Sequence, residues 1–222
     1  MKNMKCFVIA MESEAQTVLR NMEIEKEYFS CNKKVVLGTL FGERIGVVVC
    51  GVGKVNAACG AQYAIDFLNV DCIVNLGVAG GLNDGLAVGK IYCIECAVEY
   101  DFDLAQLNGT PVGTLNEFTQ RYMPLNTVLG YEKRKLATGD RFNDSEQDYL
   151  LLTKDMGADI RDMEGAAIVH ACIHAKVPAY SFKCISDLAN SGSTTEQFLQ
   201  NLQLCTKNLT EELKNIMAAI NG

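Results

Sequence analysis

The sequence predicts an α/β fold built on a central mixed β-sheet flanked by helices. Short, continuously apolar runs bounded by glycines recur along the chain, as expected of strands that are buried on both faces. Amphipathic patterns with helical spacing lie between these runs. The length of 222 residues is sufficient for one well-packed core and short for two, so residues 1–222 are predicted to form a single domain.

The first half of the chain is predicted to follow the order strand, helix, strand, strand, helix, strand. These elements occupy residues 6–10, 12–22, 35–40, 45–50, 54–68 and 72–76. The strands are assigned because their apolar residues are continuous, and the helices because apolar residues recur at three- and four-residue spacing. Polar or glycine-rich turns follow the strands that end at residues 10, 50 and 76.

The second half is predicted to follow the order strand, helix, helix, strand, helix. These elements occupy residues 90–98, 145–156, 163–175, 180–186 and 195–220. The last helix has a capping-box start, Ser193-x-x-Glu196, ahead of an apolar series. Residues 101–127 are rich in Asn, Gly, Thr and Pro and are predicted to form a long loop, a feature that is often functional in compact domains.

The composition favours a small-molecule ligand over a nucleic acid or a membrane. The net charge is −7, and no cluster of Lys and Arg is present to neutralise phosphates. No segment reaches the about eighteen consecutive apolar residues that a membrane helix needs. Glu12 and Glu14 follow the short N-terminal apolar run at once, so this run is predicted to be a strand rather than a secretory signal.

The cysteines and histidines are interpreted as structural in a reduced, cytoplasmic protein. Five cysteines lie inside apolar runs and are expected to be small core residues: Cys6, Cys50, Cys72, Cys172 and Cys184. Cys93 and Cys96 form a lone CxxC without a second pair. His170 and His174 share one helix face, but a zinc-protease helix would carry Glu where this chain has Ala171. The histidines are therefore interpreted as a packed or solvated pair, and no metal or cofactor is predicted.

Four strand ends carry the candidate site. Their turns lie at residues 10–14, 51–58, 75–81 and 182–187, and ligands of open α/β sheets bind at the carboxyl ends of strands. Each turn also has a structural explanation, because acidic residues stabilise the start of a helix and glycines permit tight turns. Asp187 ends an apolar strand, where burial would raise its pKa towards that of a general acid. A helix N-cap is the alternative role for Asp187.

Seven segments, taken together, resemble the 5′-methylthioadenosine/S-adenosylhomocysteine nucleosidases of the purine nucleoside phosphorylase/uridine phosphorylase superfamily. The segments are AMESE, GVGKVNAA, NLGVAGGL, the strand that starts GKI at Gly89, TGDRF, DMEGAAI and ISDLA, in the family's order and at compatible spacing over essentially the whole chain. The resemblance implies the three-layer phosphorylase/hydrolase-like fold, a homodimer, and a nucleoside as the small-molecule substrate.

The resemblance also implies two catalytic residues and two that hold the ribose. Asp187 would donate a proton to N7 of the purine. Glu14 would orient the attacking water, and its negative charge would favour the ribosyl cation. Met163 and Glu164 would hold the sugar, with Glu164 bonding its hydroxyls.

Further residues are assigned to the base by the same resemblance. Phe142 matches the residue that stacks on the base, and the backbone of Asn143 would read the base edge. Backbone amides near Ala189 would help to place Asp187, and Ser186, which directly precedes Asp187, is assigned to the same site.

Three positions depart from the family's pattern. Val78 stands where the nucleosidases usually carry Ser, so a hydroxyl near the sugar and the water is missing. Lys183 replaces an Arg that helps to fix Glu14, and Lys lacks the planar fork of a guanidinium. Thr195 falls near the position of an aromatic residue that lines the pocket for the 5′-substituent.

The expected activity is hydrolysis of the N-glycosidic bond of a 5′-modified adenosine, releasing adenine and a modified ribose. Phosphorolysis is the alternative within the superfamily, as is hydrolysis of a different nucleoside. Phosphorylases bind phosphate with arginines in glycine-rich turns, and no Arg occurs between Gly46 and Gln120, so water is favoured. A nucleoside-binding protein without activity is the third hypothesis.

Overall fold

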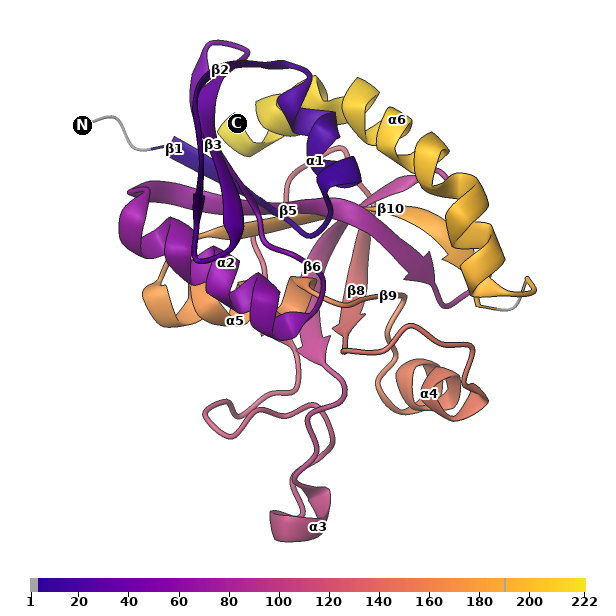
Figure 1. Ribbon diagram of the computed structural model, residues 1–222. Coiled ribbons are helices and arrows are strands. Elements are labelled where there is room, and N and C mark those ends of the chain that lie inside the picture. The colour runs from indigo at the N-terminus through magenta and orange to yellow at the C-terminus, as the bar shows by residue number, and fades with distance from the viewer. Residues whose placement is uncertain (1–3, 190) are drawn as a thin grey trace.

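The computed structural model describes residues 4–189 and 191–222 as a mixed α/β fold (Figure 1). The strands are β1 (Met4–Ile9), β2 (Met22–Ser30), β3 (Lys33–Leu40), β4 (Glu43–Val49), β5 (Val70–Gly81), β6 (Ile91–Glu99), β7 (Met123–Pro124), β8 (Lys133–Thr138), β9 (Ile160–Asp162) and β10 (Ala179–Leu188). The helices are α1 (Glu12–Leu19), α2 (Lys54–Phe67), α3 (Ala105–Asn108), α4 (Glu146–Leu150), the π-turn η1 (Leu151–Asp155), α5 (Gly165–Ala175) and α6 (Thr194–Asn221).

The sheet brings the four candidate strand ends to one edge. β4, β1, β5 and β10 are consecutive parallel neighbours, so their carboxyl ends point the same way. β5 also pairs antiparallel with the short β9, with Gly80 opposite Arg161. Because β10 pairs with β6, β6 with β8 and β8 with β9, these strands close a ring with β5. The antiparallel strands β3 and β2 extend the other side of the sheet.

Helices cover both faces of the sheet and give three layers. α2 and α5 lie side by side on one face, and α1 and α6 lie on the other (Figure 1). The apolar residues of α6 recur every three or four positions, so one side of this long helix is buried, at Cys205, Leu209, Leu213, Ile216 and Met217. None of the helices described in residues 4–189 and 191–222 is long and apolar enough to cross a membrane.

The strands and helices predicted from periodicity are present, with differences at their ends. The first helix ends at Leu19 rather than residue 22, because the chain turns there into β2. Ser193 caps α6 by accepting a hydrogen bond from the backbone N–H of Glu196 (3.4 Å), as its sequence motif predicts. The predicted helix at residues 145–156 consists of α4 and the π-turn η1.

Four of the described strands do not follow the apolar-run criterion and were not predicted: β2, β7, β8 and β9. β7 has only two residues and lies at the end of the predicted long loop. β2 is the exposed edge of the sheet, and most of its residues are charged or polar. β8 begins with three basic residues, and β9 has only three residues. These strands form because a neighbouring strand supplies their hydrogen bonds, which a local pattern does not record.

Candidate active site

A cavity of about 490 Å³ lies at the carboxyl ends of β1, β5 and β10, beside the start of α6. Seven of the residues assigned from the sequence line it: Glu14, Val78, Phe142, Met163, Glu164, Ser186 and Asp187. A wider groove of about 880 Å³ runs between α1 and α6, but Glu211 is the single carboxylate among its described lining residues. The acidic groups therefore mark the smaller cavity as the candidate active site.

Glu14 lies in the first turn of α1 and is held from two sides. One carboxylate oxygen, Oε1, accepts the backbone N–H of Val78 (2.8 Å), and the other, Oε2, accepts that of Met11 (3.1 Å). Gly77 makes this approach possible, because a Cβ there would lie 2.6 Å from Oε1. Burial raises the pKa of Glu14, and the nearby Lys183 charge and the two N–H groups partly offset that rise. The residue before α1 contacts only Oε2, and β5 contacts Oε1. Both contacts together fix the orientation of the carboxylate.

Lys183 lies beneath the cavity, paired with Asp162. The Nζ–Oδ2 distance is 2.8 Å, and each side chain is 2% exposed. The hydroxyl of Thr138 donates to the other oxygen of Asp162 (2.5 Å). Burial alone would lower the pKa of Lys183, but Asp162, Glu164 and Glu14 raise it on balance. Lys183 therefore stays charged and offsets the carboxylates around it, without lining the cavity.

Glu164 comes directly before α5, next to Met163. Its Oε1 accepts the backbone N–H of Gly53 (2.9 Å), which belongs to the glycine turn after β4. Gly53 has a φ of +97°, a conformation that favours glycine. Burial, reinforced by the charge of Asp162, raises the pKa of Glu164 to about 7. The carboxylate thus lines the cavity from the start of α5 and is held there by a glycine turn of a different segment.

Asp187 is 2% exposed and lies opposite Gly80 in the register of β10 and β5. The hydroxyl of Ser186 donates to its Oδ2 (2.7 Å). Burial raises the pKa of Asp187, and this hydrogen bond and the charge of Arg161 partly offset the rise. The alternative role as a helix N-cap is wrong, because α6 is capped by Ser193.

The assignment of backbone amides near Ala189 to the placing of Asp187 stays a prediction, although the amide of Ala189 itself has another partner. The backbone N–H of Ala189 donates to the carbonyl oxygen of Gly81 (3.0 Å), which continues the pairing of β10 with β5. That amide is therefore used by the sheet. Ser186 supplies a contact to the carboxylate.

Phe142 lines the cavity and is half exposed, at 49%. Its ring makes an edge-to-face contact with Phe198 of α6, with centroids 5.6 Å apart. Asn143 does not line the cavity, and its side chain donates to Asp148 (2.9 Å), so its backbone contact with a base stays a prediction. Phe198 also lines the cavity and was not among the predicted site residues, although it follows Thr195 by three positions on the same helix face.

Two arginines also line the cavity and were not predicted. Arg161 in β9 and Asp187 both lie against Gly80. A Cβ placed on that glycine would be 3.3 Å from Arg161 Nε and 2.8 Å from Asp187 Oδ1, so the two side chains are neighbours. Arg141 is 57% exposed and pairs with Asp148 (3.1 Å). Arg161 directly precedes the recognised DMEGAAI segment, but only the pairing of β9 with β5 brings it beside the acid.

This arrangement is suited to acid–base chemistry on a small polar molecule. At one end, the buried Asp187 has a raised pKa, as a proton donor near neutral pH requires. Elsewhere on the wall, Glu14 and Glu164 present oxygens that accept hydrogen bonds. Aromatic rings and Met163 supply apolar surface between these polar groups.

Comparisons with known proteins agree with the predicted fold and superfamily. The 5′-methylthioadenosine/S-adenosylhomocysteine nucleosidases of Arabidopsis thaliana and Geobacillus kaustophilus are 28% and 29% identical to this chain, over 97% and 96% of its length and 91% and 98% of theirs. The structure of Helicobacter pylori futalosine hydrolase is similar with a TM-score of 0.90 at 21% identity, covering 97% of both chains. The Colwellia psychrerythraea nucleosidase bound to adenine has a TM-score of 0.87 at 26% identity, covering 98% of this chain and 96% of its own. The sequence model of the phosphorylase superfamily matches residues 5–218, and the chain therefore belongs to that superfamily.

Proposed function

We propose that this protein hydrolyses the N-glycosidic bond of a purine nucleoside, with a 5′-modified adenosine as the substrate. The observation that carries this proposal is the buried Asp187, with its raised pKa, in the same cavity as Glu14 and Glu164. The curated relatives named above act on 5′-methylthioadenosine and S-adenosylhomocysteine by their names, which supports the 5′-modified class.

In the proposed reaction Asp187 donates its proton to N7 of the base. The bond between C1′ and N9 then breaks with its electrons moving to the base, which leaves as the neutral purine, and positive charge develops on the ribosyl group. Glu14 accepts a proton from water as the water oxygen bonds to C1′, and its negative charge stabilises the cation. Phe142 and Phe198 would enclose the base, and Glu164 would accept hydrogen bonds from the ribose hydroxyls.

Water is favoured over phosphate as the nucleophile by the charges near Glu14. Phosphate requires fixed cationic donors. Among the described groups that shift the pKa of Glu14, Lys183 is the one cation, and it is already paired with Asp162. The two arginines that line the cavity lie instead near Asp187 and Phe142 in the fold.

The wall near α6 is apolar enough to take an uncharged 5′-substituent. Thr195, Phe198 and Leu199 all face the cavity from the first turns of this helix. We also propose a homodimer, on the basis of the family resemblance, in which the loop at residues 101–127 would contribute across the interface.

The proposal is tested by incubating the protein with a panel of purine nucleosides, with and without phosphate, and measuring free base and sugar product. Adenine release from 5′-methylthioadenosine without phosphate is expected. Asp187→Asn is expected to lower kcat by at least about 10²-fold while nucleoside binding survives. Full turnover in that variant would contradict the role of Asp187, and formation of ribose 1-phosphate would identify a phosphorylase. Saturable binding without turnover over the whole panel would favour a nucleoside-binding protein.

Arg161 favours a second candidate substrate class, the 6-oxopurine nucleosides. On a purine ring the 6-substituent is next to N7, so a base whose N7 meets Asp187 would bring that substituent towards Arg161. A guanidinium donates hydrogen bonds and cannot accept them, whereas a 6-oxo group accepts and a 6-amino group donates. A 6-oxopurine would therefore gain a charge-assisted hydrogen bond that adenine cannot make.

This second candidate is tested with an inosine–adenosine pair that shares one sugar. If the 6-oxo preference holds, kcat/KM is larger for the inosine compound than for the adenosine compound. Arg161→Met is then expected to lower the ratio of these two kcat/KM values by about tenfold or more, because a hydrogen bond to a charged group is lost. Arg141→Met is the control, because this more exposed arginine also lines the cavity. An unchanged ratio in Arg161→Met would exclude the 6-oxo preference.

A further inference from the structure

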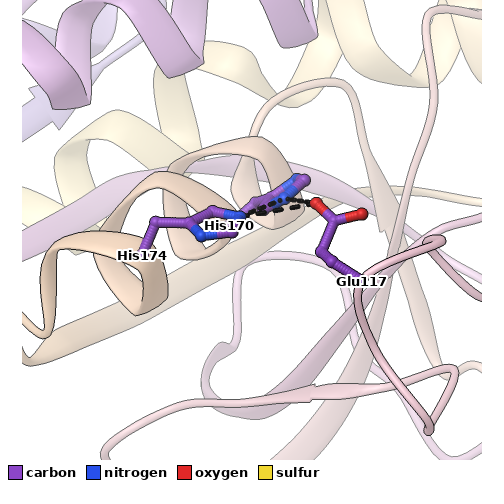
Figure 2. Close-up of side chains that lie close together, drawn as sticks. All are labelled: Glu117, His170 and His174. Atoms are coloured by element: carbon purple, nitrogen blue, oxygen red, sulfur yellow. Dashed lines mark hydrogen bonds and ion pairs between the residues drawn. The ribbon is translucent and has the colours of Figure 1, made fainter.

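Outside the cavity, three potential metal ligands converge on one point. His170 and His174 lie four residues apart on α5, and Glu117 reaches them from the long loop between α3 and β7 (Figure 2). The Nε2 atoms of the two histidines are 3.0 Å apart, and Glu117 Oε1 lies 2.7 Å from His170 Nε2 and 3.4 Å from His174 Nε2. These are the chain's 2 histidines, and both direct the same ring nitrogen at the same carboxylate oxygen.

We propose that Glu117, His170 and His174 form a binding site for a divalent transition-metal ion of the zinc type. Zn²⁺ binds imidazole nitrogen and carboxylate oxygen at about 2.0–2.2 Å in tetrahedral geometry, which places neighbouring ligand atoms about 3.4 Å apart. The separations of 2.7, 3.0 and 3.4 Å are close to that value, so small side-chain movements would admit the ion. Imidazole nitrogens are also ligands that zinc, copper and nickel prefer.

A second observation is the carboxylate behind His170. Its other ring nitrogen, Nδ1, lies 3.0 Å from Glu99 Oε1. Such a contact holds the proton on Nδ1 and leaves the lone pair of Nε2 for a metal, as in many carboxylate–histidine–metal arrangements. Glu99 is in turn fixed by Lys54, whose Nζ is 3.0 Å from its second oxygen, and Lys54 also contacts Asp101 (2.6 Å).

The three side chains leave the fourth position of a tetrahedral ion to water. In the single chain the His174 and Glu117 side chains are 56% and 43% exposed. The ring of Phe118 packs against both imidazoles, with centroids 5.5 and 5.9 Å away. The ion would therefore fasten the loop that carries Glu117 and Phe118 to α5. Its role would be to order this loop, apart from the chemistry of the cavity.

Zinc binding to the untagged, metal-stripped protein tests the site. We expect about one equivalent of Zn²⁺ per chain by calorimetry, a higher Tm in its presence, and slower proteolysis within residues 101–127. His174→Ala and Glu117→Gln are expected to weaken binding by at least tenfold, and Glu99→Gln by about 10–100-fold through the orientation of His170. Glu146→Gln makes the same chemical change at another exposed glutamate and should bind as the wild type does.

Several results would overturn the site. Absence of zinc binding by the wild type would mean that His170 is simply a protonated imidazole held between Glu99 and Glu117. Equal zinc binding by wild type and His174→Ala would place the metal elsewhere, for example at the exposed Cys31 or Cys59. Because these measurements do not use the nucleoside reaction, they remain decisive whatever substrate the cavity accepts.

Discussion

At the residue scale, the site depends on glycines that let backbone and carboxylates meet. A Cβ at Gly77 would lie 2.6 Å from Glu14, and one at Gly80 would lie 2.8 Å from Asp187. From the sequence, the glycines at this strand end are explained by a tight turn. In the structure they make room for two of the protein's own acidic side chains, and this shapes the first prediction.

Gly80→Ala is expected to lower kcat by about 10²-fold with little loss of fold. The new Cβ would displace Asp187 Oδ1, and a displacement of about 1 Å is enough to misplace a catalytic group to this extent. Steady-state kinetics on the best nucleoside of the panel, with circular dichroism for the fold, is the measurement. Gly85→Ala is the control, since Asn83 Oδ1 at 3.4 Å is the nearest atom there. Wild-type kcat in Gly80→Ala would show that Asp187 is not held at its working position by this contact.

Lys183→Met is expected to reduce the free energy of unfolding by about 3–5 kcal/mol. Removing one partner of a buried ion pair leaves the other charge, here that of Asp162, without compensation. Urea unfolding compares this variant with Lys214→Met, which changes an exposed lysine of α6. Equal stability of the two variants would mean that the ion pair between Lys183 and Asp162 does not stabilise the fold.

At the element scale, strands with continuous apolar residues could be predicted, and strands stabilised by their neighbours could not. β1, β4, β5 and β10 are apolar because they lie inside the sheet. β2 is a mostly polar edge strand and β9 has three residues, so neither contains the continuous apolar run by which the other strands were predicted. The short β9 matters most, because it carries Arg161 to the side of Asp187.

The start of α6 links stability to the cavity, because its first turns line the cavity and Ser193 caps the helix. Ser193→Ala removes the acceptor for the Glu196 N–H and is expected to reduce the free energy of unfolding by about 1 kcal/mol. We expect KM to rise as well, since Phe198 and Leu199 would lose part of their anchoring. Chemical denaturation and initial-rate kinetics are the measurements, with Ser191→Ala as the control outside the helix. No change in either quantity would show that the cap does not support the pocket.

At the scale of the whole molecule, folding buries several carboxyl groups in one cavity and thereby favours their protonated forms. Burial raises the pKa of Glu14, Glu164 and Asp187 above the values these groups have in an unfolded chain. Between the two values the folded protein binds more protons than the unfolded one, so the free energy of unfolding falls as pH rises. The charged Lys183 limits this loss without removing it.

For Glu164 this window runs from its ordinary pKa of 4.5 to about 7. We expect the stability of the wild type to decline across that range, and Glu164→Gln to show a shallower decline because it cannot ionise. Urea unfolding in buffers that cover the window is the measurement. Parallel curves for the two proteins would mean that Glu164 titrates normally in the fold.

The sequence by itself determined the α/β class, the order of the main elements and most of the acidic site, because periodicity and ordered motifs are local features. Glu14 and Glu164 lie at the starts of helices that follow short strands, and Asp187 lies in the last residues of β10. The tertiary structure alone decided what lies beside them. Arg161 reaches Asp187 through strand pairing, and Glu117 reaches His170 across 53 positions of the chain. Contacts of this kind depend on the packing of distant segments, which no local pattern encodes.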